Sequence, residues 1–483
     1  MPDVMVSPQS RSAKLCPACG RVSSDLNRCL HCWRDIAAVA PLPAEEAESA
    51  LSAARGPTGA RAGRWLTFGR TLRFGLPAIV AVLVGWWAYA TYIDKPPRPD
   101  APSSTARSAA PGGWTTRDGD NSGARSTTAP ARVGGTEAWR AALGSPAATA
   151  VVADSDLVVV SLQDGRMVGL EASSGKTLWT ATLSNPPLSP PAIAGDRVYV
   201  ALRQGLLLAL NARDGTEVWR APFNAEFYVE ASPLVAHGIV YAYSSDGIFA
   251  FDAEDGRVLW KHQLDVRSAI VTPVIEGNHL VLVTVTRAIV FDRLTGEQTY
   301  YLSFARTPPS SIAIRDGKIV GVYGRNVTAF EATSRRPWWD GLASISIGGG
   351  TVRGAWFRFY LYGMAPEVPP QEMLWTTAVS SRRTLPAAIG QGVAVVASPD
   401  GAVTALSLRD GTPAWTAKTG LLVAAPIMTA DGVLFIAENR LLLLDAATGQ
   451  QRVERKIDGL RGATPMGAGT YVSTGAGDVI ALR

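Results

Sequence analysis

Cysteine is scarce in this sequence and is confined to one end of it. The 483 residues contain four cysteines, all before residue 33, so residues 33–483 have no disulfide of their own. If that long part lies outside the cytoplasm, packing alone must hold it together. The four cysteines form two CxxC pairs within one short segment, which favours a metal site over a disulfide framework.

Histidine and recognisable catalytic motifs are equally sparse. No nucleophile elbow or metalloprotease helix is present. The glycine triplet at 348–350 precedes an expected strand rather than opening a helix, so it does not predict a phosphate-binding loop. We expect three of the histidines to fall singly in separate structural repeats. The sequence contains four: His31, His237, His262 and His279. No catalytic site is therefore predicted, although a central channel can still collect polar groups from several repeats.

The net charge of +5 is unevenly distributed. Residues 1–73 carry 10 Lys/Arg and 6 Asp/Glu, whereas residues 74–483 carry 36 and 35. The long C-terminal part is nearly neutral, so we do not expect it to bind a nucleic-acid backbone, which requires an excess of positive charge. With 47% apolar residues over its full length, the chain can bury a large core.

One long hydrophobic run divides the chain. Residues 74–93 include no charged side chain and are long enough to cross a bilayer. A buried helix would show a polar stripe, and a signal peptide would not follow 73 residues. The charges after the run nearly cancel, whereas four arginines precede it: Arg61, Arg64, Arg70 and Arg73. We therefore expect a single-pass protein of the bacterial cytoplasmic membrane, with a cytoplasmic N-terminus and an extracytoplasmic C-terminal domain.

The two CxxC pairs have the spacing of metal-binding knuckles. Each pair can present two thiolates to one tetrahedral ion. The segment resembles the compact zinc-ribbon family found at the N-termini of bacterial membrane proteins, although Trp33 stands where that family usually has Gly. The resemblance implies structural Zn²⁺ bound by Cys16, Cys19, Cys29 and Cys32. Unmetallated thiols are the alternative, and His31 is expected to face solvent.

Composition sets the remaining N-terminal boundaries. We expect residues 1–14 to be disordered, 15–36 to form the ribbon and 37–73 to be a linker. Residues 94–113 are proline-rich and read as a second linker, extended and unpacked. A nucleic-acid or protein contact through the ribbon, signalling across the membrane, is an alternative role for the cytoplasmic part.

From residue 114 onward the sequence repeats about every forty residues. Each repeat contains apolar strands of period two, a tight turn such as Asp-Gly and a tryptophan that opens the last strand. Four short strands per repeat predict a β-propeller. We expect the tryptophans to pack between neighbouring blades: Trp139, Trp179, Trp219, Trp260, Trp375 and Trp415.

The repeats predict eight blades and a defined closure. Blade starts are expected near Pro146, Pro187, Ser232, Thr272, Ser310, Leu385, Ala425 and Thr464. The last repeat ends one strand short, while an unpaired strand at residues 137–143 precedes the first. Pairing the two would remove the open sheet edge. The predicted fold is thus all-β, an eight-bladed β-propeller whose N-terminal strand closes the last blade.

Residues 114–483 resemble the pyrroloquinoline quinone (PQQ)-type propeller repeat, and residues 114–125 resemble the segment that often precedes it. One branch of this superfamily, the quinoprotein alcohol dehydrogenases, carries a disulfide beside its cofactor, whereas residues 94–483 have no cysteine. The other branch consists of binding scaffolds, exemplified by the eight-bladed lipoprotein of outer-membrane barrel assembly, and this chain resembles it in blade number. The resemblance implies a non-catalytic protein-binding scaffold in envelope assembly or sensing, without PQQ. The alternative is a membrane-bound PQQ-dependent oxidoreductase.

The fifth repeat carries a long aromatic insert at residues 334–371. Inserts of this length between adjacent strands are uncommon without a purpose. A hydrophobic lid on the propeller is one interpretation, and a patch that binds an unidentified protein partner or touches the membrane is the other. The partner-binding candidates are Trp338, Trp339, Trp356, Phe357 and Tyr360.

Overall fold

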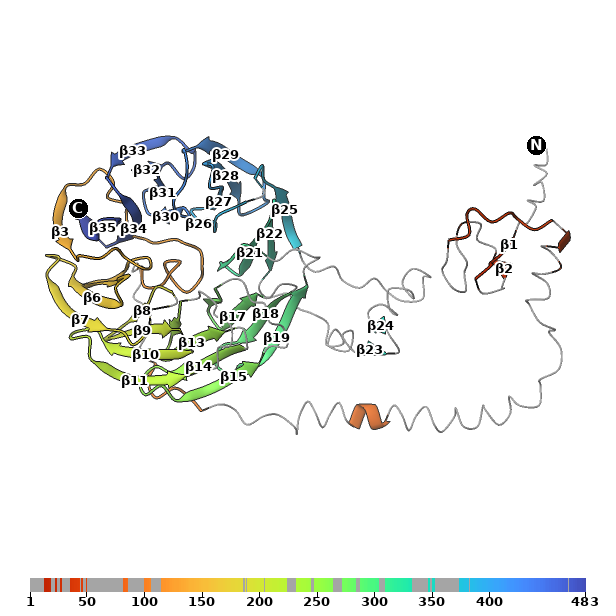
Figure 1. Cartoon of the computed structure of the whole chain (residues 1–483), viewed down its shortest axis with the longest axis horizontal. Coiled ribbons are helices and arrows are strands. Elements are labelled where there is room, and N and C mark those ends of the chain that lie inside the picture. Colours follow the sequence, from red (N-terminus) through yellow and green to blue (C-terminus); the bar gives the residue numbers. More distant parts are fainter. Residues whose placement is uncertain are drawn as a thin grey trace. The chain divides into compact units, whose positions relative to one another are not determined.

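The computed structural model describes two parts of the chain (Figure 1). The described residues are 13–18, 22–23, 27, 35–43, 45–46, 49, 81–85, 100–105 and 114–483, without 186, 188, 204, 224–231, 245–246, 264–271, 284–286, 304–308, 332–345, 348–349, 352–372, 382 and 468. The chain divides into two compact units, Met1–Pro97 and Arg98–Arg483.

The first unit contains a short antiparallel hairpin around the first CxxC pair. Its strands are β1 (Lys14–Leu15) and β2 (Val22–Ser23). Cys16 is fully buried and packs against Ile36. The Leu42 amide donates to the Ala13 carbonyl at 2.8 Å, so contacts reach beyond the predicted ribbon boundaries of 15 and 36. Cys19, Cys29 and Cys32 lie outside the described residues, and the zinc site stays a prediction.

The predicted membrane span is described over five residues. Residues 81–85 are helical, and the remainder of 74–93 is not among the described residues. Within the described chain, no helix has the length and apolar character needed to cross a membrane. The span and its orientation stay predictions.

The second unit is a ring of blades (Figure 1). In the described residues, eight antiparallel sheets of four strands each follow one another around the ring. Blades 1 to 4 consist of β4 (Val152–Asp154), β5 (Leu157–Ser161), β6 (Arg166–Glu171), β7 (Thr177–Thr182); β8 (Ala192–Ala194), β9 (Arg197–Leu202), β10 (Leu206–Asn211), β11 (Glu217–Pro222); β12 (Leu234–Ala236), β13 (Ile239–Ser244), β14 (Gly247–Asp252), β15 (Val258–Gln263); and β16 (Val274–Glu276), β17 (His279–Val283), β18 (Arg287–Asp292), β19 (Gln298–Ser303).

Blades 5 to 8 complete the ring. They consist of β20 (Ser311–Arg315), β21 (Lys318–Tyr323), β22 (Asn326–Glu331), β25 (Met373–Ala378); β26 (Ala388–Gly390), β27 (Val393–Ala397), β28 (Ala402–Ser407), β29 (Pro413–Lys418); β30 (Ile427–Thr429), β31 (Gly432–Ala437), β32 (Arg440–Leu444), β33 (Gln451–Lys456); and β34 (Leu460–Met466), β35 (Gly469–Thr474), β36 (Asp478–Leu482), β3 (Glu137–Ala142). A separate hairpin of β23 (Ser346–Ile347) and β24 (Gly350–Thr351) lies within the insert of blade 5.

The N-terminal strand closes the ring as predicted. β3 pairs antiparallel with β36, and the register runs from Glu137 opposite Leu482 to Ala142 opposite Asp478. Without β3, β36 would present unpaired backbone groups at the edge of blade 8. The eight blades and this closure confirm the predicted all-β, eight-bladed propeller.

Burial follows the position of a strand within its blade. In blade 1 the second strand, LVVVS, is buried throughout because neighbouring blades cover both of its faces. The outermost strand β7 is mostly exposed, with Trp179 buried and Ala181 half-buried. Apolar clusters join neighbouring blades: Val159 of blade 1 lies in one cluster with Val198 of blade 2. The core is therefore a series of layers between blades.

The repeated tryptophans lie in these layers, as predicted. Trp219 of blade 2 donates from Nε1 to the Ala253 carbonyl of blade 3 at 3.2 Å, and its ring lies over Gly256. Gly256 has φ 76°, and a Cβ there would lie 2.6 Å from the ring, so the turn requires glycine twice over. The same indole-to-carbonyl bond joins Trp139 to Ala172, Trp179 to Ala212, Trp260 to Arg293, Trp375 to Leu408 and Trp415 to Ala446.

Two details differ from the sequence-based expectation. Residues 94–113 were expected to be unpacked, but the Ser103 amide and hydroxyl both donate to Asp252 of blade 3 at 2.7 Å. The histidines do not all fall in separate blades, because His237 lies in the turn between β12 and β13 and His262 lies on β15 of the same blade. Both residues therefore belong to blade 3.

Candidate functional site

Residues 114–133, here called the inner segment, run along the innermost strands of the ring. The innermost strand of a blade has one unpaired edge, whose amides and carbonyls need partners. The segment supplies them: in blades 4 to 7, for example, the amides of Ile275, Ile314, Ile389 and Met428 donate to the carbonyls of Asn121, Ser122, Ala124 and Arg125 at 2.6 to 2.9 Å. Hydrogen bonds also link it to Ala153, Ile193, Val235 and Thr470. It thus contacts all eight blades.

One arginine anchors the inner segment. Arg125 forms an ion pair with Asp118 at 2.5 Å and lies over the ring of Trp114, with its guanidinium carbon 5.7 Å from the ring centroid. Its Nε donates to the Pro426 carbonyl at 3.0 Å. Both charged side chains are largely buried, at 10% and 16% exposed. These residues come from the preamble that the sequence suggested, and their role is to hold the segment in place.

Two neighbouring cavities open beside the inner segment. The first, about 360 Å³, lies between blades 5 and 6 and is lined by Arg315, Lys318, Gln391 and Arg409, among others. The second, about 380 Å³, shares Arg315 and Gln391 and adds hydroxyl groups of the inner segment, from Ser126 to Thr128. Both have the volume of a small-ligand pocket.

The first cavity is the more strongly charged of the two. Three cationic side chains line it, Arg315, Lys318 and Arg409, against one carboxylate, Asp316. Arg315 also forms an ion pair with Asp120 at 3.4 Å and donates to the Ser126 hydroxyl, which ties it to the inner segment. A cavity of this composition attracts anionic groups.

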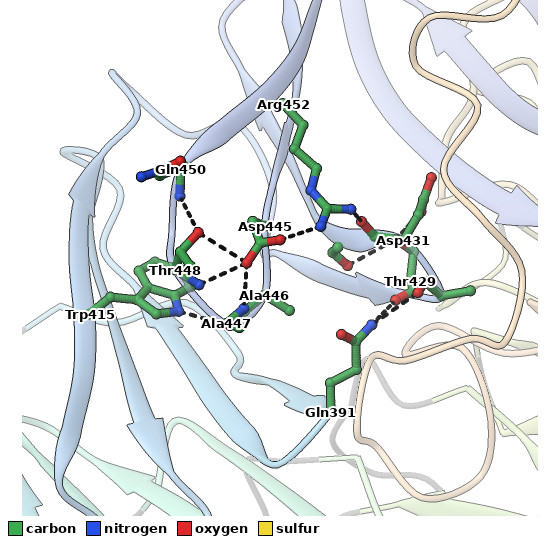
Figure 2. Close-up of polar contacts among 12 residues, drawn as sticks. Gln391, Trp415, Thr429, Asp431, Asp445, Ala446, Ala447, Thr448, Gln450 and Arg452 are labelled. Carbon is green, nitrogen blue, oxygen red and sulfur yellow. Dashed lines mark hydrogen bonds and ion pairs between the residues drawn. The ribbon is translucent and has the colours of Figure 1, made fainter.

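The turns beyond the second cavity are held by a polar network (Figure 2). Gln391 Nε2 donates to the Thr429 carbonyl at 2.6 Å, which joins blades 6 and 7. Asp445 accepts from the Thr448 amide at 2.8 Å and pairs with Arg452. The Thr448 amide and hydroxyl, together with Arg452, lower the pKa of Asp445 below its ordinary value. Of these residues, Gln391 and Thr429 line the second cavity, so the bond between them holds part of its wall.

The predicted site residues are covered unevenly. Of the four zinc ligands, Cys16 is described and buried. The five aromatic candidates of the insert, Trp338, Trp339, Trp356, Phe357 and Tyr360, lie outside the described residues. Where the chain is described, no three His, Cys, Asp or Glu side chains come together as metal ligands.

Sequence reasoning missed the charged cavity between blades 5 and 6. Its cations come from three separate turns and strands, and single charged residues in repeats resemble ordinary solvated positions. A signal was nevertheless present. When the repeats are aligned at the turn that follows the innermost strand, blade 5 has Arg315 where blade 4 has Glu276.

The fold and the inner segment together define an eight-bladed propeller of PQQ-like repeats. The family model described as outer membrane protein assembly factor BamB matches residues 126–264, 190–417 and 248–483, and the chain belongs to this family. No curated protein matches the chain.

Solved structures share the fold at low sequence identity. BamB from Moraxella catarrhalis is 16% identical, with a TM-score of 0.53, over 72% of this chain and 97% of that one. Quinohemoprotein alcohol dehydrogenase from Comamonas testosteroni is 14% identical, with a TM-score of 0.54, over 77% and 80%. A europium-containing methanol dehydrogenase is 11% identical, with a TM-score of 0.54, over 76% and 90%. At these identities the similarity extends to the fold alone.

Proposed function

We propose that this chain is a membrane-anchored, non-catalytic scaffold that binds protein in the bacterial envelope. The propeller faces the outside of the cytoplasmic membrane, and the zinc ribbon lies in the cytoplasm. Membership of a family described as an assembly factor supports a binding role. That description names outer-membrane assembly, which is one kind of envelope scaffolding.

The way the chain uses the centre of its ring carries the proposal. The inner segment hydrogen-bonds to the innermost strands of blades 1 to 7 and to Thr470 on β35 of blade 8, so the edge groups it meets serve the fold. Its one buried arginine, Arg125, is committed to Asp118 and to backbone carbonyls. The two cavities lie beside this segment and take in side chains from blades 5 to 7. This arrangement supports recognition of a partner at the surface.

A PQQ-dependent oxidoreductase is the second candidate, favoured by the fold shared with quinoprotein dehydrogenases. The quinone of that class is bound together with Ca²⁺, which needs six to eight oxygen ligands, usually including carboxylates. The described residues do not bring three acidic or histidine side chains together. This supports the scaffold over the oxidoreductase.

A titration and a crosslink test the two candidates together. Purified full-length protein titrated with PQQ and CaCl₂ should show no saturable change in the quinone absorbance. A photocrosslinking residue at Trp339, in the insert, should capture one discrete protein in living cells, whereas one at the exposed Leu178 of β7 should not. Binding of one quinone per chain would overturn the scaffold in favour of the oxidoreductase, and equal capture from both positions would remove the insert's role.

Zinc content tests the N-terminal part of the proposal. Protein solubilised from the membrane fraction should carry one zinc per chain, and Cys16→Ser should lose it because a closed four-ligand site does not hold the ion with three. His31→Ala is the control and should keep the metal, since His31 is not among the four ligands. Elemental analysis gives the metal content. Zinc retained in Cys16→Ser, or lost in His31→Ala, would contradict the ligand set.

A further inference from the structure

A tight turn of blade 5 binds the carboxylate of Glu276, from blade 4, through its backbone amides. The turn Asp316–Gly317 joins β20 to β21, with φ values of 52° and 68°. Glu276, the last residue of β16 in blade 4, accepts from the Asp316 amide at 2.8 Å and from the Gly317 amide at 2.9 Å, one bond to each carboxylate oxygen. Two successive amides in this left-handed conformation thus cradle one planar anion.

Blade 6 repeats the turn but not the carboxylate. Gln391 and Gly392 join β26 to β27 with φ values of 49° and 78°, nearly those of the turn in blade 5. Arg315 ends β20 and pairs with Lys318, just as Glu276 ends β16 and pairs with His279. The residue facing this second turn is therefore a cation. Within the described chain, neither amide of the Gln391–Gly392 turn meets an acceptor.

The surroundings of the second turn suit an anion. Lys318 and Arg409 line the same cavity as Arg315 and the turn. The Nε of Arg315 is buried and has no acceptor among the described residues. A Cβ built on Gly392 would meet nothing within 4 Å, so there is space directly above the turn. Three cationic side chains and the turn thus line one cavity, against the single carboxylate of Asp316.

We propose that the Gln391–Gly392 turn, with Arg315, Lys318 and Arg409, binds a carboxylate supplied by an acidic side chain of a bound polypeptide. The chain itself shows the recognition, because Glu276 occupies the same turn one blade earlier. The adjoining cavity of about 380 Å³, lined by the hydroxyls of the inner segment, provides room for neighbouring residues of that polypeptide. The polypeptide source rests on the proposed scaffold role, whereas the carboxylate chemistry does not.

Peptide binding to the purified full-length protein tests the site. The probe is a fluorescein-labelled peptide containing two glutamates, and the comparison peptide has glutamines in their place. Fluorescence anisotropy should give saturable binding of the acidic peptide and at least tenfold weaker binding of the glutamine peptide. Arg409→Glu should weaken the acidic peptide at least tenfold, because it reverses a charge in the cavity wall. Arg315→Glu should also block peptide binding. The new glutamate would occupy the position in blade 5 that Glu276 occupies in blade 4, and it would bind the Gln391–Gly392 turn itself.

The matched control is Arg213→Glu. Arg213 occupies in blade 2 the turn position that Arg409 occupies in blade 6, and both are exposed. Arg213→Glu should leave the dissociation constant within twofold of that of the unchanged protein. Far-ultraviolet circular dichroism and the unfolding midpoint of each variant show whether the propeller remains folded; Arg409 is exposed and its replacement should not unfold it.

Three outcomes would overturn the proposal. Binding that is unchanged in both Arg409→Glu and Arg315→Glu would place the peptide elsewhere. Displacement of the peptide by inorganic phosphate more readily than by glutarate would make the site one for tetrahedral anions. Binding of glutarate without the acidic peptide would remove the polypeptide source. The scaffold proposal is tested separately by the crosslink in living cells, so failure of one is distinguishable from failure of the other.

Discussion

Replacing Trp219 by alanine should lower the free energy of unfolding of the propeller by about 3 to 5 kcal/mol. Trp219 is 8% exposed, lies over Gly256 of the next blade and donates to the Ala253 carbonyl. The substitution removes a large buried ring, leaves a cavity between blades 2 and 3, and takes from the Ala253 carbonyl one of its two donors, the other being the Tyr199 hydroxyl. Urea denaturation followed by circular dichroism measures the change.

Val218→Ala is the control for Trp219→Ala. Val218 precedes Trp219 on β11 and is 40% exposed, so its truncation should change the free energy of unfolding by no more than about 0.5 kcal/mol. A loss below about 1 kcal/mol for Trp219→Ala, or equal losses for the two variants, would show that the indole-to-glycine contact is not a main source of interblade stability.

Arg125→Met should be the second severe substitution. Removing one partner of a buried ion pair costs about 3 to 5 kcal/mol, because the other charge is left without compensation. Here Asp118 would lose its partner at 2.5 Å, and the Pro426 carbonyl would lose its donor. We expect a lower free energy of unfolding in urea denaturation and faster proteolytic cleavage within residues 114–133.

Arg140→Met provides the matched control for Arg125→Met. Arg140 also pairs with carboxylates, those of Glu137 and Asp478, but its side chain is 46% exposed. Solvent screens such pairs, and their removal costs at most about 1 kcal/mol. Adding Asp118→Leu to Arg125→Met should restore part of the lost stability by removing the uncompensated charge. No recovery in the double variant would mean that the backbone bonds of Arg125, rather than the ion pair, hold the inner segment.

Repetition made the architecture predictable from sequence. Alternating apolar residues, Asp-Gly turns and tryptophans recur at one spacing, and each signal is local or reaches only the next repeat. Trp219 and Gly256 illustrate this, because the residue types already indicate a flat ring over a turn without a side chain. The closing strand was predictable from an unpaired strand at one end and a missing strand at the other.

The charged cavity was not predictable in the same way. Arg315, Gln391 and Arg409 are separated by up to 94 positions, and none of them is unusual for a residue in a turn or at the end of a strand. What brings them together is the angular spacing of blades 5 and 6. The inner segment was likewise visible in sequence as a preamble, but its contacts with all eight blades depend on the ring having closed.

The sequence by itself determined the all-β class, the eight repeats, the residues between blades and the strand that closes the ring. These follow from hydrophobic periodicity and turn chemistry, which act over a few residues. Only the tertiary structure decided that the preamble bonds to the inner strands of blades 1 to 7 and to β35 of blade 8. It also decided that Arg315 faces the turn of blade 6, whose counterpart one blade earlier binds the carboxylate of Glu276. Such contacts depend on blade geometry, since hydrogen bonds and ion pairs form between whichever groups the fold places within about 3 Å.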